Sequence, residues 1–175
     1  MDWSQMRDNQ QNAMNAMYQN TAASHFERRQ TKTFTIDVAI ALAADKTFSV
    51  NLHEPLKIDK LSDVYLEAFT TFKAKANTAV ANMAFLLKIN EFNIQSNAAK
   101  STDASDLFNS LIIPNSGDNA AKVFIHKNKK LNYICSLNPE TLSTISGSVT
   151  DVDGSAAFAA DNSRFIAEFV IVARD

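Results

Sequence analysis

The sequence has few of the residues on which cross-linked and phosphate-binding domains depend. Among its 175 residues there are one cysteine, three glycines and three prolines. A lone cysteine, Cys135, can neither form an internal disulfide nor supply a metal site with several thiolates. No glycine cluster lets the backbone approach a phosphate group closely. We therefore expect neither a disulfide scaffold nor a phosphate-binding loop, and stability must come from packing.

An excess of one charge and a long apolar run are also lacking. The chain has 17 basic and 19 acidic residues, a formal net charge of −2. This balance excludes the general basic excess by which a protein coats nucleic acid. The longest purely apolar stretch, Val38 to Ala44, has seven residues, whereas a membrane-spanning helix needs about 20. We expect no direct nucleic-acid contact and no membrane-crossing segment.

Patterns for catalysis and metal binding are missing as well. His25, His53 and His126 are separated, with no carboxylate or second histidine at a metal-binding spacing. No Gly-x-Ser-x-Gly turn is present, and Cys135 falls on a predicted buried strand face. The basic segment from His126 to Lys130 is expected to be a solvated turn. We therefore predict no catalytic residue, no metal and no cofactor, and the chain is not expected to be an enzyme. A jelly-roll enzyme of the cupin type, which needs clustered histidines, is disfavoured.

The first 30 residues differ in composition from the rest. They hold four of the five methionines, the only tryptophan and many Gln and Asn residues. Several apolar side chains fall loosely on one helical stripe. We predict an N-terminal arm over residues 1–30, extended or a short helix, whose partner-binding residues are Trp3, Met6, Met14, Met17 and Tyr18. The alternative is a frayed terminus without a role.

From Thr31 onward the pattern has the period of two that is typical of β-strands. The apolar residues Phe34, Ile36, Val38, Ile40 and Leu42 alternate with polar or small ones. Strand composition recurs at 47–52, 63–72, 83–92, 111–113, 122–126, 130–137, 143–151 and 164–173. We count about eight strands of comparable length and no convincing helix after residue 30.

These strands predict an all-β fold. We expect a single eight-stranded antiparallel jelly-roll sandwich over residues 31–175, with long loops at 93–110 and 152–163 at the ends of the sandwich. An immunoglobulin-like sandwich is the alternative, disfavoured because paired cysteines are absent. In the segment 130–137, Leu131, Tyr133, Cys135 and Leu137 are expected on one buried face. The segment 164–173 is apolar on both faces, which predicts a central strand covered on two sides.

Four segments resemble a known family of viral proteins. They are Ala84–Ile94, Leu111–Asn115, Lys130–Pro139 and Arg164–Phe169. They are similar to the penton, or vertex, capsid proteins of the nucleocytoplasmic large DNA viruses, and most similar to those of large algal viruses. The resemblance spans roughly Thr31 to Asp175 and consists of strand and turn sequences, with no catalytic signature.

The resemblance implies a structural role in a virion. A single jelly roll of this family forms a homopentamer around each fivefold vertex of an icosahedral shell that assembles in the host cell. The implied partners are trimers of the double jelly-roll major capsid protein and minor capsid proteins, with an internal membrane nearby. No reaction is implied. Because cyclic symmetry requires a heterologous interface, each subunit would need two unlike contact surfaces.

A function of another class is compatible with the same architecture. Jelly-roll modules that bind carbohydrates or receptors use an exposed aromatic side chain as a sugar platform. Tyr65 and Phe158 are the candidates for such a platform in this sequence.

Overall fold

The computed structural model describes residues 31–92, 94, 109–126 and 132–174. The chain divides into two units, Met1–Gln30 and Thr31–Asp175. The predicted arm, with all five of its partner-binding residues, lies outside the described residues, as does most of the predicted loop 93–110. Everything that follows concerns the second unit.

The regular secondary structure in the described part of the second unit is almost wholly β-strand. The strands are β1 (Thr31–Ile40), β2 (Thr47–Ile58), β3 (Ser62–Phe72), β4 (Ala84–Ile89), β5 (Leu111–Pro114), β6 (Val123–His126), β7 (Asn132–Leu137), β8 (Glu140–Thr150) and β9 (Ser163–Ala173). One short 3-10 helix, η1 (Val80–Asn82), precedes β4. The prediction of an all-β fold is confirmed.

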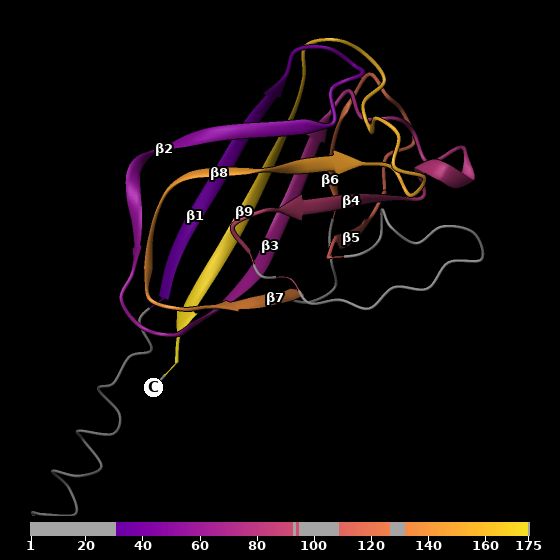
Figure 1. Ribbon diagram of the computed structural model, residues 1–175. Coiled ribbons are helices and arrows are strands. Elements are labelled where there is room, and N and C mark those ends of the chain that lie inside the picture. The colour runs from indigo at the N-terminus through magenta and orange to yellow at the C-terminus, as the bar shows by residue number, and fades with distance from the viewer. Residues whose placement is uncertain (1–30, 93, 95–108, 127–131, 175) are drawn as a thin grey trace, which may run out of the picture. The chain divides into compact units, whose positions relative to one another are not determined.

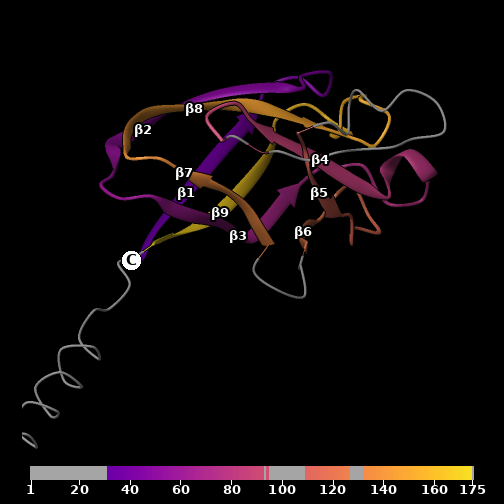
Figure 2. The same cartoon turned by 60° about the horizontal axis from the view of Figure 1, so that its bottom comes forward.

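The strands form two antiparallel sheets that face each other. One has the order β1-β9-β3-β6, with β7 also paired to β3, and the other has the order β2-β8-β4-β5. Figures 1 and 2 show the sheets as two layers, with the strands of one crossing those of the other at a steep angle. Aromatic rings join the layers, because Phe48 of β2 contacts Phe165 of β9 and Phe69 of β3 contacts Phe85 of β4. One hydrophobic core lies between them.

The strand pairs are nested along the chain. β4 pairs with β5, β3 with β6 and β7, β2 with β8, and β1 with β9. β9 occupies one edge of β3 from Ser62 to Phe72, while β6 pairs with Phe69–Phe72 and β7 with Ser62–Leu66. β6 and β7 therefore share the opposite edge of β3. The chain is arranged as one long hairpin whose successive strand pairs alternate between the two sheets.

β9 occupies the predicted central position, between β1 and β3. Its inner side chains, Phe165, Ala167, Phe169 and Ile171, are almost fully buried. On its outer face, Ile166, Val170 and Val172 are only half-buried. The expectation that this strand is covered on two sides was therefore wrong, because the outer face of its sheet is partly open to solvent.

Two further side chains differ from the expectation. Leu42 is 57% exposed because β1 ends at Ile40 and the chain bends before the alternation reaches it. Tyr133 is 53% exposed, although Cys135 and Leu137 are buried as predicted. The register steps from Val64 opposite Cys135 to Tyr65 opposite Tyr133, so Ile134 is an extra residue, a β-bulge that turns Tyr133 outward.

Candidate interaction surfaces

The described residues contain no cluster of three or more His, Cys, Asp or Glu side chains that could hold a metal ion. Within the same residues, no helix is long and apolar enough to cross a membrane. Two of the networks of polar side chains in the described residues include buried groups next to β5 and β6, one around His126 and one around Asn115 and Asp151.

His126 is the last residue of β6 and is 2% exposed, so the prediction that it begins a solvated turn was wrong. The backbone N–H of Ser116 donates to its Nδ1 at 3.1 Å. Since Nδ1 accepts, Nε2 carries the ring proton and donates to Thr71 Oγ1 at 2.7 Å. The rings of Phe69 and Phe85 pack against the imidazole. Burial lowers the pKa of His126 to about 4.

The hydroxyl of Ser116 also lies 3.2 Å from His126 Nδ1, a distance at which a histidine can act as the general base for a serine nucleophile. That hydroxyl donates to the carbonyl oxygen of Ile125 at 3.1 Å, and the Nδ1 lone pair accepts the Ser116 N–H. The imidazole is therefore not placed to remove the hydroxyl proton. These contacts hold the segment after β5 against β6.

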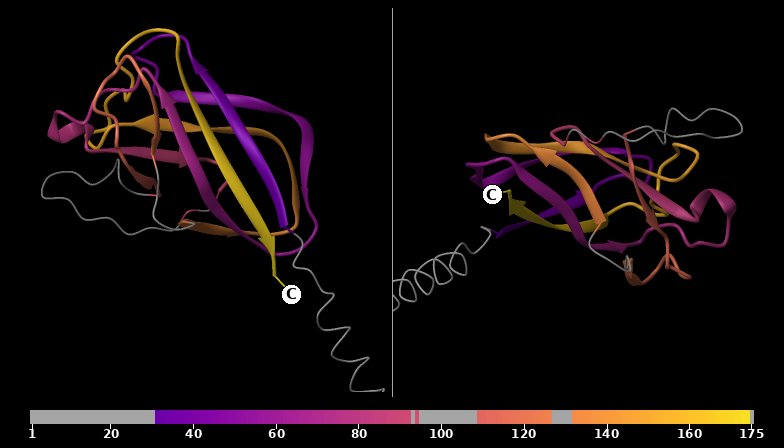
Figure 3. Two further views of the ribbon diagram at one scale, coloured as in Figure 1. Left: turned by 180° about the vertical axis from the view of Figure 1, so that it is seen from behind. Right: turned by 90° about the horizontal axis from the view of Figure 1, so that it is seen from below.

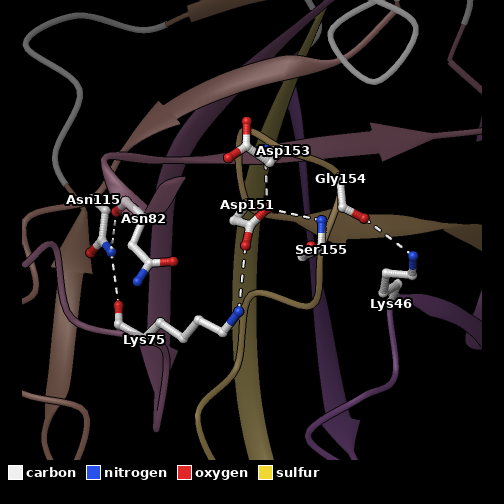
Figure 4. A network of polar contacts seen from close by, with 8 residues as sticks. All are labelled: Lys46, Lys75, Asn82, Asn115, Asp151, Asp153, Gly154 and Ser155. Atoms are coloured by element: carbon white, nitrogen blue, oxygen red, sulfur yellow. Dashed lines mark hydrogen bonds and ion pairs between the residues drawn. The ribbon is translucent and has the colours of Figure 1, made fainter. Parts of the chain in front are cut away.

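Asn115 is the centre of the second network (Figure 4). Its side-chain amide donates to the carbonyl oxygens of Lys75 and Asn82, each at 2.9 Å. Its Oδ1 accepts from the N–H of Gly117 at 2.9 Å, and its own N–H donates to the carbonyl of Met83 at 2.9 Å. The side chain thus fastens the segment that follows β5 to the chain before η1, at Lys75, and to Asn82, the last residue of η1.

Asp151 closes the neighbouring turn. Its Oδ1 accepts from the N–H groups of Asp153 and Ser155, at 3.1 and 2.8 Å, and its Oδ2 lies 3.4 Å from Lys75 Nζ. The carboxylate is 5% exposed, so both oxygens are used within the fold. Val152, the next residue, donates its N–H to the carbonyl of Ala81 in η1 at 3.1 Å. This turn is therefore a second attachment for η1.

These two attachments hold an exposed apolar protrusion. Val80 is 84% exposed and Met83 is 60% exposed. We call the segment 77–83, with these two side chains, the η1 knob. In Figure 2, η1 projects from the end of the sandwich at which β4 begins. Exposed apolar groups on a fixed protrusion are typical of a contact surface.

A hollow lies on the outer face of the β1-β9-β3-β6 sheet. It has a volume of about 440 Å³ and a mostly apolar lining from β3, β6 and β9: Thr70, Thr71, Phe72, Val123, Arg164, Phe165 and Ile166. Phe72 lies opposite Val123 and Arg164 in the sheet. We call this the β6 hollow. Its outermost wall is Val123, which is 61% exposed, and Ile125, on the same strand, is 57% exposed. The left panel of Figure 3 shows the outer face of this sheet from behind.

Basic side chains surround the β6 hollow. Arg164 pairs with Asp37 across β9 and β1, and its guanidinium holds the pKa of that carboxyl below its ordinary value. Lys73 follows β3 in the left-handed region, with φ 60°, and its Nζ lies 5.3 Å from the centre of the Phe72 ring. Lys122, which directly precedes Val123, is exposed.

An aromatic pair lies at the other end of the same face. The rings of Tyr65 and Tyr133 meet edge to face with centroids 5.8 Å apart. Tyr65, one candidate sugar platform, is half-buried. Phe158, the other candidate, is 2% exposed and stacks on Phe165 in the core, so the expectation that it is an exposed platform was wrong.

Sequence reasoning missed both surfaces that the fold assembles. The knob depends on hydrogen bonds from Asn115 and Val152, which are distant from it in the sequence. For the β6 hollow, the sequence did carry one signal, which is the apolar composition of the outer face of β9. Comparisons with protein-family models, with curated proteins and with solved structures find no match for this chain.

Proposed function

We propose that this chain is a structural capsid protein that forms the pentameric vertex of the icosahedral shell of a large DNA virus. The observation that carries the proposal is the nested strand pairing, from β4–β5 outward to β1–β9. A jelly roll is a hairpin of this kind wrapped into two four-stranded sheets. Nine strands are described, but β6 and β7 share one edge of β3. Counted as positions, the sheets contain eight strands, which favours a jelly roll over an immunoglobulin-like sandwich.

The resemblance to vertex capsid proteins supports the same proposal. Its four segments contain β4, β5, β7 and residues 164–169 of β9, and these strands contribute to both sheets. The segments therefore belong to the framework of the fold, as expected when a family shares an architecture without a reaction.

The exposed apolar surfaces also favour an assembly subunit. Cyclic symmetry brings one side of a subunit against a different side of its neighbour. The η1 knob and the β6 hollow are two unlike apolar surfaces on one domain. The further partners would be trimers of the major capsid protein and minor capsid proteins, with the internal membrane nearby, and residues 1–30 would contact such neighbours.

The proposal is tested on virus particles purified from the source of this chain. Mass spectrometry should detect the protein in the particles at a small fraction of the amount of the main shell protein. Immunogold labelling with an antibody against residues 31–175 should place it at the vertices. Absence from purified particles, or labelling spread evenly over the facets, would contradict a vertex role.

A carbohydrate-binding module is the second candidate, because the Tyr65 and Tyr133 rings form an aromatic pair at the surface. Aromatic faces of this kind can stack on sugar rings. A glycan array distinguishes the two functions. The vertex proposal predicts no binding in the micromolar range, whereas glycan binding that is lost in Tyr133→Ala would favour the module.

A further inference from the structure

We propose that β6 is an edge strand that acid releases: protonation of His126 detaches β6 from β3 and from the segment after β5, while the rest of the sandwich stays folded. The proposal concerns how this fold responds to pH, and it does not rest on the proposed function. It is carried by the position of one imidazole, which contacts β3, β4 and the segment after β5.

β6 is a short edge strand with little buried surface. It has four residues, lies at the end of the order β1-β9-β3-β6, and pairs with β3 from Phe69 to Phe72. Val123 and Ile125 are exposed and Phe124 is half-buried, so His126 is the only fully buried side chain of the strand. Strands with few buried contacts open at a lower free energy than the whole domain. The attachment of β6 therefore depends on His126 more than on its other side chains.

The neutral imidazole joins the edges of the two sheets. Its Nε2–H donates to Thr71 Oγ1 of β3, and its Nδ1 accepts the N–H of Ser116, which follows β5. The ring packs against Phe69 of β3 and Phe85 of β4, with centroids 5.9 and 4.8 Å apart. His126 makes these contacts only with an unprotonated Nδ1, because that nitrogen must accept.

Protonation removes the reason for the ring to stay in place. A proton on Nδ1 faces the N–H of Ser116, so that hydrogen bond is lost. The Ser116 hydroxyl, 3.2 Å from Nδ1, is a nearby acceptor, but one neutral hydroxyl does not replace the water around a charged ring. The ring is 2% exposed, so the charge is hydrated only if the ring moves into solvent. Since His126 is the last residue of β6, the strand moves with it.

The described groups that face the ring carry no charge. They are Phe69 and Thr71 from β3, Phe85 from β4 and Ser116 after β5. Burial is the only cause of the lowered pKa of His126, so the charged groups that the structure describes nearby do not act on it. Along the same elements, these charged groups are Glu67, Lys73, Lys88, Asp118 and Lys122. Lys127, Lys129 and Lys130 follow in the sequence, outside the described residues.

The size of the response follows from two pKa values. The imidazole has its ordinary pKa of 6.5 in the released strand and a pKa of about 4 in the attached strand. The ratio of released to attached strand therefore rises about 20-fold between pH 7 and pH 5. Release uncovers the edge of β3 from Phe69 to Phe72. An unpaired strand edge of this kind can accept a strand from a partner, so acid would open a binding edge.

Hydrogen exchange in the full chain at pH 7 and pH 5 tests the proposal. The exchange rates are corrected for their intrinsic pH dependence and expressed as protection factors for β6 and for the central strand β9. The protection of β6 should fall about 20-fold from pH 7 to pH 5. It should also be about tenfold or more below the protection of β9 at both pH values. Equal protection in the two strands would show that β6 opens only with the whole sandwich, which contradicts the proposal.

A disulfide between β6 and β3 gives a sharper test. Thr70→Cys/Ile125→Cys places two thiols at opposed positions of these strands. In the oxidised variant, β6 should be as protected as β9, and reduction should restore the lower protection and its fall with pH. Thr33→Cys/Val170→Cys, at opposed positions of β1 and β9, is the matched control and should leave the response of β6 unchanged. A response of β6 that is the same with the β3–β6 disulfide open and closed would overturn the proposal.

His126→Gln identifies the titrating group. Glutamine does not change its charge between pH 7 and pH 5, so the protection of β6 should be low at both pH values and should differ less than about twofold between them. His53→Gln should retain the fall of about 20-fold. A fall of this size that persists in His126→Gln would show that another group drives the release. Circular dichroism shows that each variant is folded, and the disulfide test remains if His126→Gln is not.

Discussion

The side-chain amide of Asn115 donates a hydrogen bond to the carbonyl oxygen of Asn82 at 2.9 Å, and thereby ties the segment after β5 to the last residue of η1. The same amide donates to the carbonyl of Lys75, so one buried side chain spans the entrance and the exit of the turn. The shape of the η1 knob therefore depends on a residue that is not part of it.

Asn115→Ala should lower the free energy of unfolding by about 2–4 kcal/mol, because it leaves buried carbonyl and N–H groups without partners. Urea unfolding of the full chain measures this. Asn119→Ala is the matched control, since its side chain accepts one hydrogen bond from Ala121 at an exposed position, and its loss should stay below about 1 kcal/mol. Equal losses in the two variants would contradict the role given to Asn115.

Gly147→Ala should destabilise the fold because β8 and β4 approach closely at this residue. A Cβ at position 147 would lie 1.9 Å from the carbonyl oxygen of Lys88 and 3.0 Å from the Phe48 ring. The backbone of β4 must move to admit it, and the expected loss is about 3 kcal/mol. Thermal and urea unfolding measure the change.

Gly117→Ala is the control for this variant, because the atoms that a Cβ would meet there, at 3.1 Å, belong to the side chains of Asn115 and Phe124. The approach at position 117 is closer than an ordinary contact by only a few tenths of an ångström, whereas at position 147 the backbone oxygen is 1.9 Å away. The loss at position 117 should therefore be smaller than at position 147. A Gly147→Ala protein as stable as the unsubstituted chain would show that the two strands are not in close contact.

Stability should fall as the pH decreases from about 6.5 to about 4. Burial lowers the pKa of His126 from 6.5 to about 4, so the unfolded chain binds a proton in this range while the folded chain does not. The contribution of His126 to the free energy of unfolding therefore has its full value above pH 6.5. It decreases toward pH 4, by about 3 kcal/mol. Protonation of Nδ1 would also place its new N–H against the N–H of Ser116, so that the hydrogen bond between them would be lost.

Nuclear magnetic resonance titration of the histidine signals measures the pKa of His126 directly, and urea unfolding at several pH values measures its effect. His53→Gln, at an exposed position of β2, serves as the control and should retain the pH dependence. A midpoint for His126 near 6.5 would show that the side chain is not buried as described.

Deletion of residues 1–30 should leave the sandwich folded, because every described strand lies between Thr31 and Ala173. The truncated protein should unfold with unchanged cooperativity but should enter virus particles less efficiently than the full chain. Quantitative mass spectrometry of particles that assemble in the presence of both forms measures the ratio. Incorporation equal to that of the full chain would refute a docking role for the arm.

The period-two alternation predicted the strands of the sandwich well, since one face of each strand must be buried in the core. Residues such as Phe34 and Ile36 of β1, and Phe169 and Ile171 of β9, carry this signal in the sequence. The register of β2 with β8 shifts between Asn51 and Leu56, a stretch that contains Pro55, which cannot donate to regular strand pairing.

The errors arose where a local irregularity changed which face a side chain occupies. The bulge at Ile134 turned Tyr133 outward, and alternation alone does not reveal an extra residue. The location of Phe158 in the core depends on the path of the loop between β8 and β9, which has no periodic pattern.

The candidate surfaces could not be predicted for a related reason. The hollow gathers Thr70, Val123 and Ile166 from three strands whose neighbours are set only by the sheet order. The knob is exposed because the core is complete without it, and its rigidity comes from Asn115, which follows β5. Neither relationship is local in the sequence.

The central claim is that five copies of this sandwich close around a fivefold axis of a virus shell. Electron cryo-microscopy of intact particles, with the vertex density resolved finely enough to trace strands, tests it most directly. The account predicts five copies of the β1-β9-β3-β6 and β2-β8-β4-β5 sheets at each vertex. A vertex built from a different protein, with this chain elsewhere or absent, would contradict it.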